Sequence, residues 1–133
     1  MKTPARLVVA AALVGLLHAH PAAAAEPHAP SVFHRVYPPA TQAARDWAWK
    51  RLGGKQFDCL DRLWHFESGW RVRAGRVTGS YGIPQAYPGT KMRSAGADWQ
   101  TNPMTQVRWG LGYVRKYGGP CGAWAFWQQH RWY

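Results

Sequence analysis

The chain has 133 residues, with 17 Lys and Arg against 6 Asp and Glu, 9 Trp and 2 Cys. This length allows one domain of ordinary size and excludes multi-domain machinery, a doubly wound nucleotide-binding fold and a multi-span membrane protein. The net charge of +11 indicates anionic partners, and the high aromatic content excludes a disordered chain.

The first 25 residues have the layout of a secretory signal peptide. Lys2 and Arg6 precede an apolar run over residues 7–17, and a small-residue stretch ends at Ala25, directly before Glu26. Because the apolar run is shorter than the about 20 residues that span a bilayer, we expect cleavage after Ala25, with a retained anchor as the alternative. The sequence therefore predicts a secreted protein without stable membrane insertion.

The remaining chain divides into a leader and a domain. Residues 26–40 contain four prolines and no apolar period, so they are predicted to be a flexible leader. Residues 41–133 are the predicted domain, in which four helices surround a loop-rich region. The expected fold class is mainly α.

The first predicted helix begins at Thr41, which is placed to cap it, and ends at Gly53. Ala43, Trp47 and Leu52 lie on its expected apolar side. The pattern is less regular than in the helices that follow.

The second predicted helix covers residues 56–67 and has the clearest apolar face. Phe57, Leu60, Leu63 and Trp64 follow the spacing i, i+3, i+6, i+7, which places them on one side of a helix. Residues 68–98 are rich in Gly, Ser, Thr and Pro and are predicted to be loops with short strands at most. Functional residues are often found in such segments.

The third and fourth predicted helices close the chain. Asn102 is the expected N-cap of the third helix and Pro103 its first residue, and the helix ends before Gly118. The fourth helix covers residues 121–129.

The two cysteines are expected to form a disulfide, because an exported chain reaches an oxidising compartment. A bond between Cys59 and Cys121 would close a loop of about 60 residues, for which chain entropy gives about 4 kcal/mol of stabilisation. Two buried free thiols are the alternative.

Glu67 ends the second predicted helix and is the one glutamate of the predicted domain. Leu63 and Trp64 precede it by four and three residues and are expected to press against its carboxyl, and desolvation raises a carboxyl pKa. The helix C-terminus also disfavours a negative charge. A carboxyl that stays protonated near neutral pH is what a general acid requires, whereas a solvated helix-end residue is the alternative.

Seven short motifs follow one another along the domain. They are CLDRLWHFESGW from Cys59, SYGIPQ from Ser80, PGTKM from Pro88, AGADW from Ala95, TNP from Thr101, WGLGY from Trp109 and PCGAW from Pro120. Together they resemble the lysozyme-like domain of secreted lytic transglycosylases, in the actinobacterial form that is related to the C-terminal domain of aggregation-promoting factors. The resemblance covers residues 55–133.

This resemblance implies a small goose-lysozyme-like domain that cleaves the β-1,4 bond between N-acetylmuramic acid and N-acetylglucosamine in peptidoglycan. The family's catalytic glutamate maps to Glu67 and the serine that follows it to Ser68. The family's Gly-x-x-Gln motif, which lines the cleft, maps to Gly82 and Gln85, with Tyr81 beside them. The Tyr-Asn pair that many relatives carry in the last helices is missing, because residues 123–128 read AWAFWQ.

The predicted domain has few acidic residues, which limits the mechanisms by which it could cleave a glycosidic bond. Ordinary glycosidases use two carboxyls about 5 to 9.5 Å apart. Asp58 and Asp61 precede Glu67 by nine and six residues, which places them roughly 13 and 9 Å along the helix axis. Asp61 is expected to form a surface pair with His65, and Asp98 to serve as a cap or turn residue. A transglycosylase needs no second carboxyl, because the 6-hydroxyl of the sugar is its nucleophile; hydrolysis by water is the alternative.

The aromatic residues divide into core and cleft candidates. Trp64, Trp109 and Trp124 fit the spacing of core residues, and Trp124 and Trp127 are candidates to replace the missing tyrosine. Indole and phenol rings in loops offer faces to which sugars can bind. The candidate substrate-binding residues are therefore Ser68, Trp70, Tyr81, Gln85, Tyr87 and Trp124, with Trp99 as a further cleft candidate.

The expected partner of the basic chain is the anionic cell wall, with peptidoglycan glycan strands as substrate. The basic residues are scattered and accompany no nucleic-acid motif, so we expect no nucleic-acid partner. The histidines show no metal-ligand spacing, and we expect no cofactor or metal and a monomeric protein. A non-catalytic wall-binding or basic membrane-active protein is the alternative to the enzyme.

Overall fold

The computed structural model describes residues 35–133, and the predicted signal peptide and residues 26–34 of the predicted leader lie outside this range. The elements in chain order are α1 (Pro39–Leu52), α2 (Gly54–Ser68), η1 (Gly89–Ala95), α3 (Pro103–Val114), η2 (Arg115–Tyr117) and α4 (Pro120–His130), where η marks a 3₁₀-helix. In the described part, extended pairing is limited to isolated bridges at Tyr81. The prediction of a mainly α domain is confirmed.

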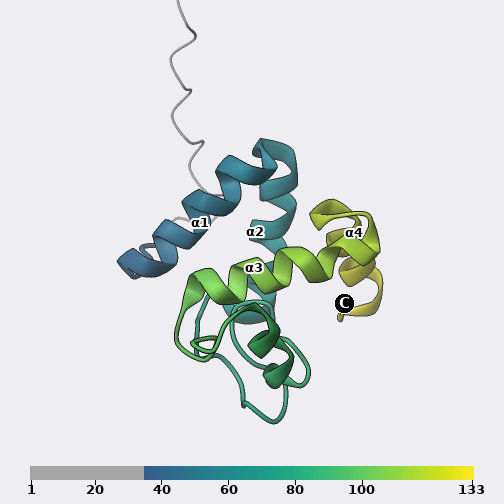
Figure 1. Ribbon diagram of the computed structural model, residues 1–133. Helices are drawn as coiled ribbons and strands as arrows, with labels where there is room; N and C mark the ends of the chain where they lie inside the picture. Colours follow the sequence, from purple (N-terminus) through teal and green to yellow (C-terminus); the bar gives the residue numbers. More distant parts are fainter. Residues whose placement is uncertain (1–34) are drawn as a thin grey trace, which may run out of the picture.

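The other three α-helices pack around α2. Figure 1 shows α3 running across α2, with α1 on one side of α2 and α4 on the other. The main core contains the four apolar residues predicted on one face of α2, and each of them is at most 1% exposed: Phe57, Leu60, Leu63 and Trp64. The helical period therefore predicted both the extent of α2 and its buried face.

The predicted start and buried side of α1 were wrong. Pro39, at the first helical position, begins the helix, and Thr41 lies buried inside it and caps nothing. The buried face carries Thr41, Ala44, Arg45 and Ala48. A charged residue in this face breaks the apolar pattern from which the face was predicted.

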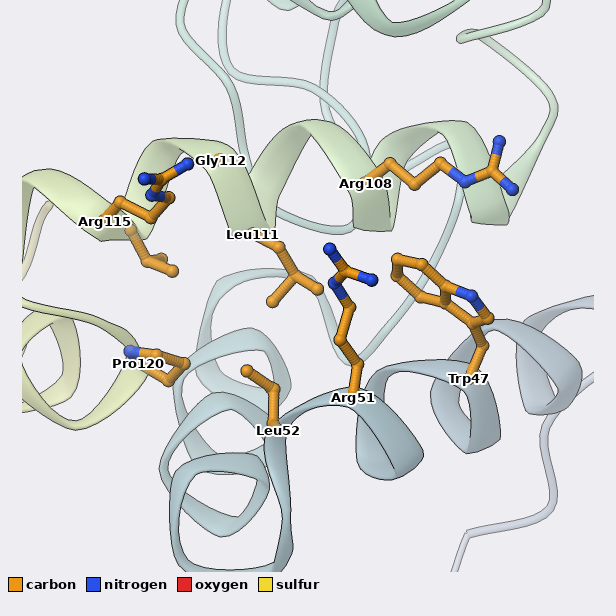
Figure 2. Close-up of a pocket in the computed structure, with 9 residues that line it drawn as sticks. Trp47, Arg51, Leu52, Arg108, Leu111, Gly112, Arg115 and Pro120 are labelled. Carbon is orange, nitrogen blue, oxygen red and sulfur yellow. The ribbon is translucent and has the colours of Figure 1, made fainter.

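The residues of the expected apolar side of α1 are less buried than predicted. Ala43 is exposed, and Trp47 and Leu52 are partly buried. Figure 2 shows Trp47 and Leu52 on α1 across from Leu111 on α3, in the space between the two helices.

The domain begins before residue 41. Tyr37 is 8% exposed and meets the ring of Trp70 edge-on, with the ring centroids 6.4 Å apart. Arg35 donates from Nη1 to the carbonyl oxygen of Gly69 over 3.3 Å. The last residues assigned to the leader are thus part of the packed domain.

The loop-rich segment between α2 and α3 is fastened by one buried side chain. Gln106 of α3 accepts from the Ile83 N–H over 2.8 Å and donates to the carbonyl oxygens of Val72 and Trp99 over 2.9 and 2.8 Å. Gly82 lies against it, and a Cβ there would come within 2.5 Å of the Gln106 side chain. Four further residues of the segment form a second small core, namely Tyr81, Ala86, Met92 and Trp99.

The predicted caps of α3 are confirmed. Asn102 accepts from the Met104 N–H over 2.8 Å, and Pro103 is the first helical residue. Asp98 accepts from the side chains of Asn102 and Thr105, each over 2.7 Å, and its carbonyl oxygen accepts from the N–H groups of Thr101 and Asn102. Of the two expected roles, cap or turn residue, the structure shows the turn residue. Among residues 35–133, no helix combines the length and hydropathy needed to span a bilayer.

The predicted disulfide is confirmed and joins α2 to α4. Cys59 and Cys121 are bonded, with their Cα atoms 4.9 Å apart and a sequence separation of 62. Because the bond restricts the unfolded chain, the Cys59→Ser/Cys121→Ser double variant should lose about 2–5 kcal/mol of unfolding free energy in urea denaturation. A double variant with the denaturation midpoint of the wild type would contradict this expectation.

Candidate active site

Glu67 lies in the last turn of α2 with its carboxyl half-buried against α4. The indole Nε1–H of Trp127 donates to its Oε1. Burial raises the pKa of this carboxyl, and the hydrogen bond from Trp127, which lowers it, only partly offsets that effect. The carboxyl therefore takes up a proton at higher pH than an exposed glutamate.

Two hollows meet at Glu67. The larger, of about 490 Å³, is lined by Glu67, Ser80, Gln85, Tyr87, Lys91, Tyr113, Arg131, Trp132 and Tyr133. The smaller, of about 310 Å³, is lined by Arg35, His65, Phe66, Glu67, Ser68, Gly69 and Arg71. Glu67 is the one residue common to both linings, so a ligand in either hollow would lie next to this residue.

None of the aspartates among residues 35–133 lines these hollows. Asp61 is 2% exposed and pairs with Arg45, so the expectation that it lies at the surface was wrong. Asp98 accepts from the side chains of Asn102 and Thr105, and Asp58 is exposed on α2. Glu67 is thus the one carboxylate side chain in the linings of the two hollows.

Ser68 has a structural position beside the carboxyl. It is 3% exposed, and its hydroxyl donates to the carbonyl oxygen of Ile83 over 2.7 Å and lies 3.2 Å from that of Trp64. The hydroxyl therefore ties the end of α2 to the loop segment. Gly69 follows in the left-handed conformation, with φ of 60°, which turns the chain sharply out of the helix.

Gln85 and Tyr87 both line the larger hollow with Glu67. The Gln85 amide nitrogen donates to the carbonyl oxygens of Gly82 and Ala74, over 2.9 and 3.3 Å, so its own carbonyl oxygen is the atom that can accept from a ligand hydroxyl. Tyr87 is 70% exposed and presents a ring at the rim. These two predicted binding residues are brought together with Glu67.

Three aromatic residues expected in the cleft lie in the core. Trp70 and Trp99 are 1% and 2% exposed, and Tyr81 is buried with its hydroxyl donating to the carbonyl oxygen of Gln100 over 2.9 Å. A loop segment without regular structure must bury its own apolar residues to stay packed, and these rings fill that role. They support the site and do not line the two hollows.

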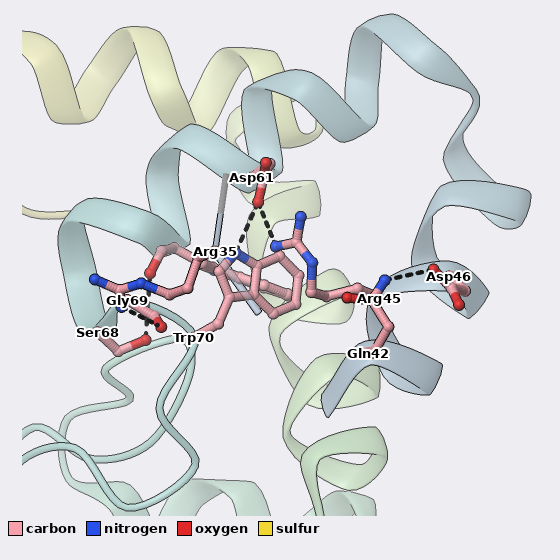
Figure 3. Close-up of polar contacts among 9 residues, drawn as sticks. Arg35, Gln42, Arg45, Asp46, Asp61, Ser68, Gly69 and Trp70 are labelled. Carbon is pink, nitrogen blue, oxygen red and sulfur yellow. Dashed lines mark hydrogen bonds and ion pairs between the residues drawn. The ribbon is translucent and has the colours of Figure 1, made fainter. Parts of the chain in front are cut away.

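Trp70 belongs to a buried polar network next to the site (Figure 3). Its indole N–H donates to Asp61 over 2.9 Å, and Asp61 also accepts from Arg45. The Arg45 guanidinium lies 4.3 Å from the ring centroid of Tyr37 and 4.4 Å from that of Trp70. The network joins α1, the middle of α2 and the residue that follows the turn at Gly69.

An aromatic cluster, made up of Phe66, Trp124 and Trp127, lies beside Glu67. Trp124 stacks on both Phe66 and Trp127, with ring centroids 5.7 and 5.3 Å apart. Phe66 is 55% exposed and Trp124 partly exposed, so the cluster has an open face. Trp124 is thus placed beside the carboxyl through Trp127, whereas Trp109 packs on the second small core and Trp64 is fully buried.

Several residues at the two hollows had not been predicted from the sequence. Tyr133 accepts from the Trp64 indole N–H and donates to the carbonyl oxygen of Pro84, both over 2.8 Å. Burial and the nearby Glu67 raise the Tyr133 pKa well above its usual value, which keeps the phenol neutral. Lys91 belongs to a motif of the resemblance, but a role for Tyr133, Arg131 or Trp132 had no signal in the sequence.

The pH dependence of the site should respond to Trp127. If Glu67 acts as an acid, activity falls as the pH rises through its pKa. The Trp127 N–H stabilises the ionised carboxyl, so Trp127→Phe should raise the Glu67 pKa and move the alkaline limb of the pH–rate profile to higher pH. Trp124→Phe, which changes the same cluster without removing that bond, is the control. If the alkaline limb moved equally in both variants, the hydrogen bond from Trp127 would not be the group that lowers the Glu67 pKa.

The described residues contain no group of three or more His, Cys, Asp or Glu side chains that could hold a metal ion. Comparison of the chain with protein-family models, with curated proteins and with solved structures gave no significant match. What the site can do therefore follows from the chemistry of its own residues, above all from one half-buried carboxyl between two hollows.

Proposed function

We propose that this protein is a secreted peptidoglycan lytic transglycosylase with a lysozyme-like fold, and that Glu67 is its catalytic acid and base. The observation that carries the proposal is the half-buried Glu67 carboxyl, with a raised pKa, at the junction of two hollows. The motifs along residues 55–133, which resemble those of secreted lytic transglycosylases, supply the substrate class.

The reaction requires one carboxyl. The protonated Glu67 carboxyl donates its proton to the glycosidic oxygen as the bond to C1 of the muramoyl residue breaks. The 6-hydroxyl of the same muramoyl residue forms a bond to C1 and loses its proton to the Glu67 carboxylate. The proton count on Glu67 is restored, and the product carries a 1,6-anhydromuramoyl end.

The surroundings of Glu67 suit a glycan strand. Two hollows whose linings share Glu67 give room for more than one sugar unit near the bond that breaks. Gln85 and Tyr87 offer an acceptor oxygen and an exposed ring in the larger hollow. The open face of the aromatic cluster gives a further surface of the kind on which pyranose rings pack.

The choice between cyclisation and hydrolysis depends on what reaches C1. Hydrolysis by the same carboxyl is the second candidate, because Glu67 could deprotonate a water instead of the sugar hydroxyl. Since Glu67 is the one carboxylate lining the hollows, no described side chain is placed to activate a water from the opposite face of the sugar, as inverting enzymes require. This argues against inverting hydrolysis, and the resemblance to lytic transglycosylases favours the intramolecular reaction over hydrolysis by Glu67 itself.

The proposal is tested by incubating the protein with purified insoluble peptidoglycan. We expect soluble glycan fragments to appear in the supernatant in proportion to the amount of protein. If the protein sediments with peptidoglycan and releases no fragments, the third candidate, a non-catalytic wall-binding protein favoured by the net charge of +11, replaces the enzyme.

A further inference from the structure

A third hollow, of about 620 Å³, shares no lining residue with the two at Glu67. It lies between α1 and α3 and reaches the start of α4 (Figure 2). Its lining consists of Trp47, Arg51, Leu52, Arg108, Leu111, Gly112, Val114, Arg115 and Pro120. The mechanism proposed above uses none of these residues.

Three arginines give this hollow its charge. Figure 2 shows Arg108 on α3, Arg115 just beyond the end of α3 at the start of η2, and Arg51 reaching up from α1 between them. All three side chains are exposed, and no carboxylate belongs to the lining. Among residues 35–133, no ion pair joins any of these three guanidinium groups to a carboxylate.

Two carboxylates, those of Asp98 and Asp46, are candidates to neutralise the arginines, and both already accept hydrogen bonds from other side chains. Asp98 accepts hydrogen bonds from the side chains of Asn102 and Thr105, which lower its pKa, and the charge of Arg108 adds a smaller lowering. Asp46 of α1 accepts from Gln42 over 2.8 Å. Neither carboxylate lines the hollow, which leaves its positive charge without a counter-charge from its own walls.

Two of the guanidinium groups are held at one aromatic ring. Arg51 and Arg108 lie 5.4 and 5.6 Å from the ring centroid of Trp47, so cations from two helices flank the same indole. Like charges brought together in this way are stabilised by an anion that contacts both. The guanidinium fork matches the oxygens of a phosphate, and the ionisation of a phosphodiester does not change near neutral pH.

The remaining walls are apolar. Leu52 and Leu111 face each other across the hollow, and Pro120 closes one end (Figure 2). In a ligand that carries several negative charges joined by carbon chains, the apolar walls can contact the carbon chains. The arginines spaced along the hollow can contact successive negative charges. The combination fits a flexible chain of phosphodiesters joined by short carbon units.

We propose that this hollow binds a polyol-phosphate polymer of the cell wall, in which phosphodiesters link small alcohols. The choice of a wall polymer as the source of the phosphates rests on the proposed function, whereas the phosphate chemistry rests on the hollow itself. Binding there would hold the enzyme at the wall and leave the two hollows at Glu67 open to the glycan.

The test measures binding of fluorescently labelled poly(glycerol phosphate) to the full domain at low ionic strength. We expect Arg51→Gln/Arg108→Gln to weaken binding at least about tenfold and to reduce its salt dependence, because two phosphate contacts are lost. Arg62→Gln/Arg76→Gln removes the same charge from exposed residues outside the hollow and should change affinity less than about threefold. Equal losses in the two double variants would overturn the proposal.

Two further arms separate binding of the wall polymer from binding of nucleic acid and from catalysis at Glu67. A single-stranded DNA with the same number of phosphates should bind more weakly, and tighter binding of DNA through the same arginines would overturn the wall polymer in favour of nucleic acid. Glu67→Gln should bind poly(glycerol phosphate) like the wild type, and Arg51→Gln/Arg108→Gln should still cleave peptidoglycan freed of phosphate polymers. Failure of the binding site and failure of the proposed activity are therefore distinguishable.

Discussion

Glu67→Gln is expected to reduce the release of soluble fragments from purified peptidoglycan by at least about 100-fold. General acid–base catalysis contributes about 10²–10⁴-fold, and in this site one carboxyl both donates and accepts the proton. The glutamine amide keeps nearly the same shape and can still accept the Trp127 hydrogen bond, but it cannot transfer a proton. The measurement is the initial rate of fragment release at equal protein concentration.

Asp58→Asn is the matched control for this variant. It removes one negative charge from an exposed position on the same helix and should leave the rate within about twofold. A Glu67→Gln protein that releases fragments at the wild-type rate would refute the assigned role.

The same substitution has a predictable effect on stability, which shows whether the variant is folded. The pKa of Glu67 is higher in the folded protein than in the unfolded chain. As the pH rises from the pKa of the unfolded chain to that of the folded protein, ionisation of this carboxyl lowers the stability of the fold. The stability contributed by its protonated form is therefore lost as the pH rises through this window. Glu67→Gln should gain melting temperature relative to the wild type at pH 7, and this gain should shrink as the pH approaches 4.

Asp61→Ala is expected to cost about 3–5 kcal/mol of unfolding free energy. The Arg45–Asp61 pair is buried, with its two side chains 1% and 2% exposed, and removal of one partner leaves the other charge without compensation. The variant also removes the acceptor of the Trp70 indole N–H. Urea denaturation at pH 7 measures the loss.

Two companion variants test the cause of this loss. Asp58→Ala changes an exposed aspartate of the same helix and should stay within about 0.5 kcal/mol of the wild type. Arg45→Met/Asp61→Leu replaces the pair by apolar groups of similar size and should recover most of the stability, because no uncompensated charge remains. If Asp61→Ala lowers the unfolding free energy by less than about 1 kcal/mol, the buried Arg45–Asp61 pair does not contribute substantially to the stability of the domain.

The sequence predicted the elements whose signals are local. The α2 period, the Asn102 cap and the proline that begins α3 depend on neighbours a few residues apart, and all three were confirmed. The buried face of α1 was missed because it includes Arg45. That residue is stabilised by Asp61 and two aromatic rings, which are distant in sequence.

The candidate site was only partly predictable for the same reason. Glu67 was identified because it follows apolar residues at helical spacing, but its partner Trp127 lies 60 positions further along the chain. The location of Trp70 in a loop segment indicated an open cleft, yet its indole N–H reaches a buried carboxylate and the ring lies in the core. Sequence position alone does not distinguish a ring that lines a cleft from one that supports it.

The most direct test of the proposed mechanism is mass spectrometry of the fragments that the protein releases from purified peptidoglycan. With a single carboxyl at the junction of the two hollows, we predict fragments with 1,6-anhydromuramoyl ends from the wild type and none from Glu67→Gln. Fragments heavier by one water would show hydrolysis and contradict the intramolecular reaction. Anhydro fragments released equally by Glu67→Gln would contradict the role of Glu67 itself.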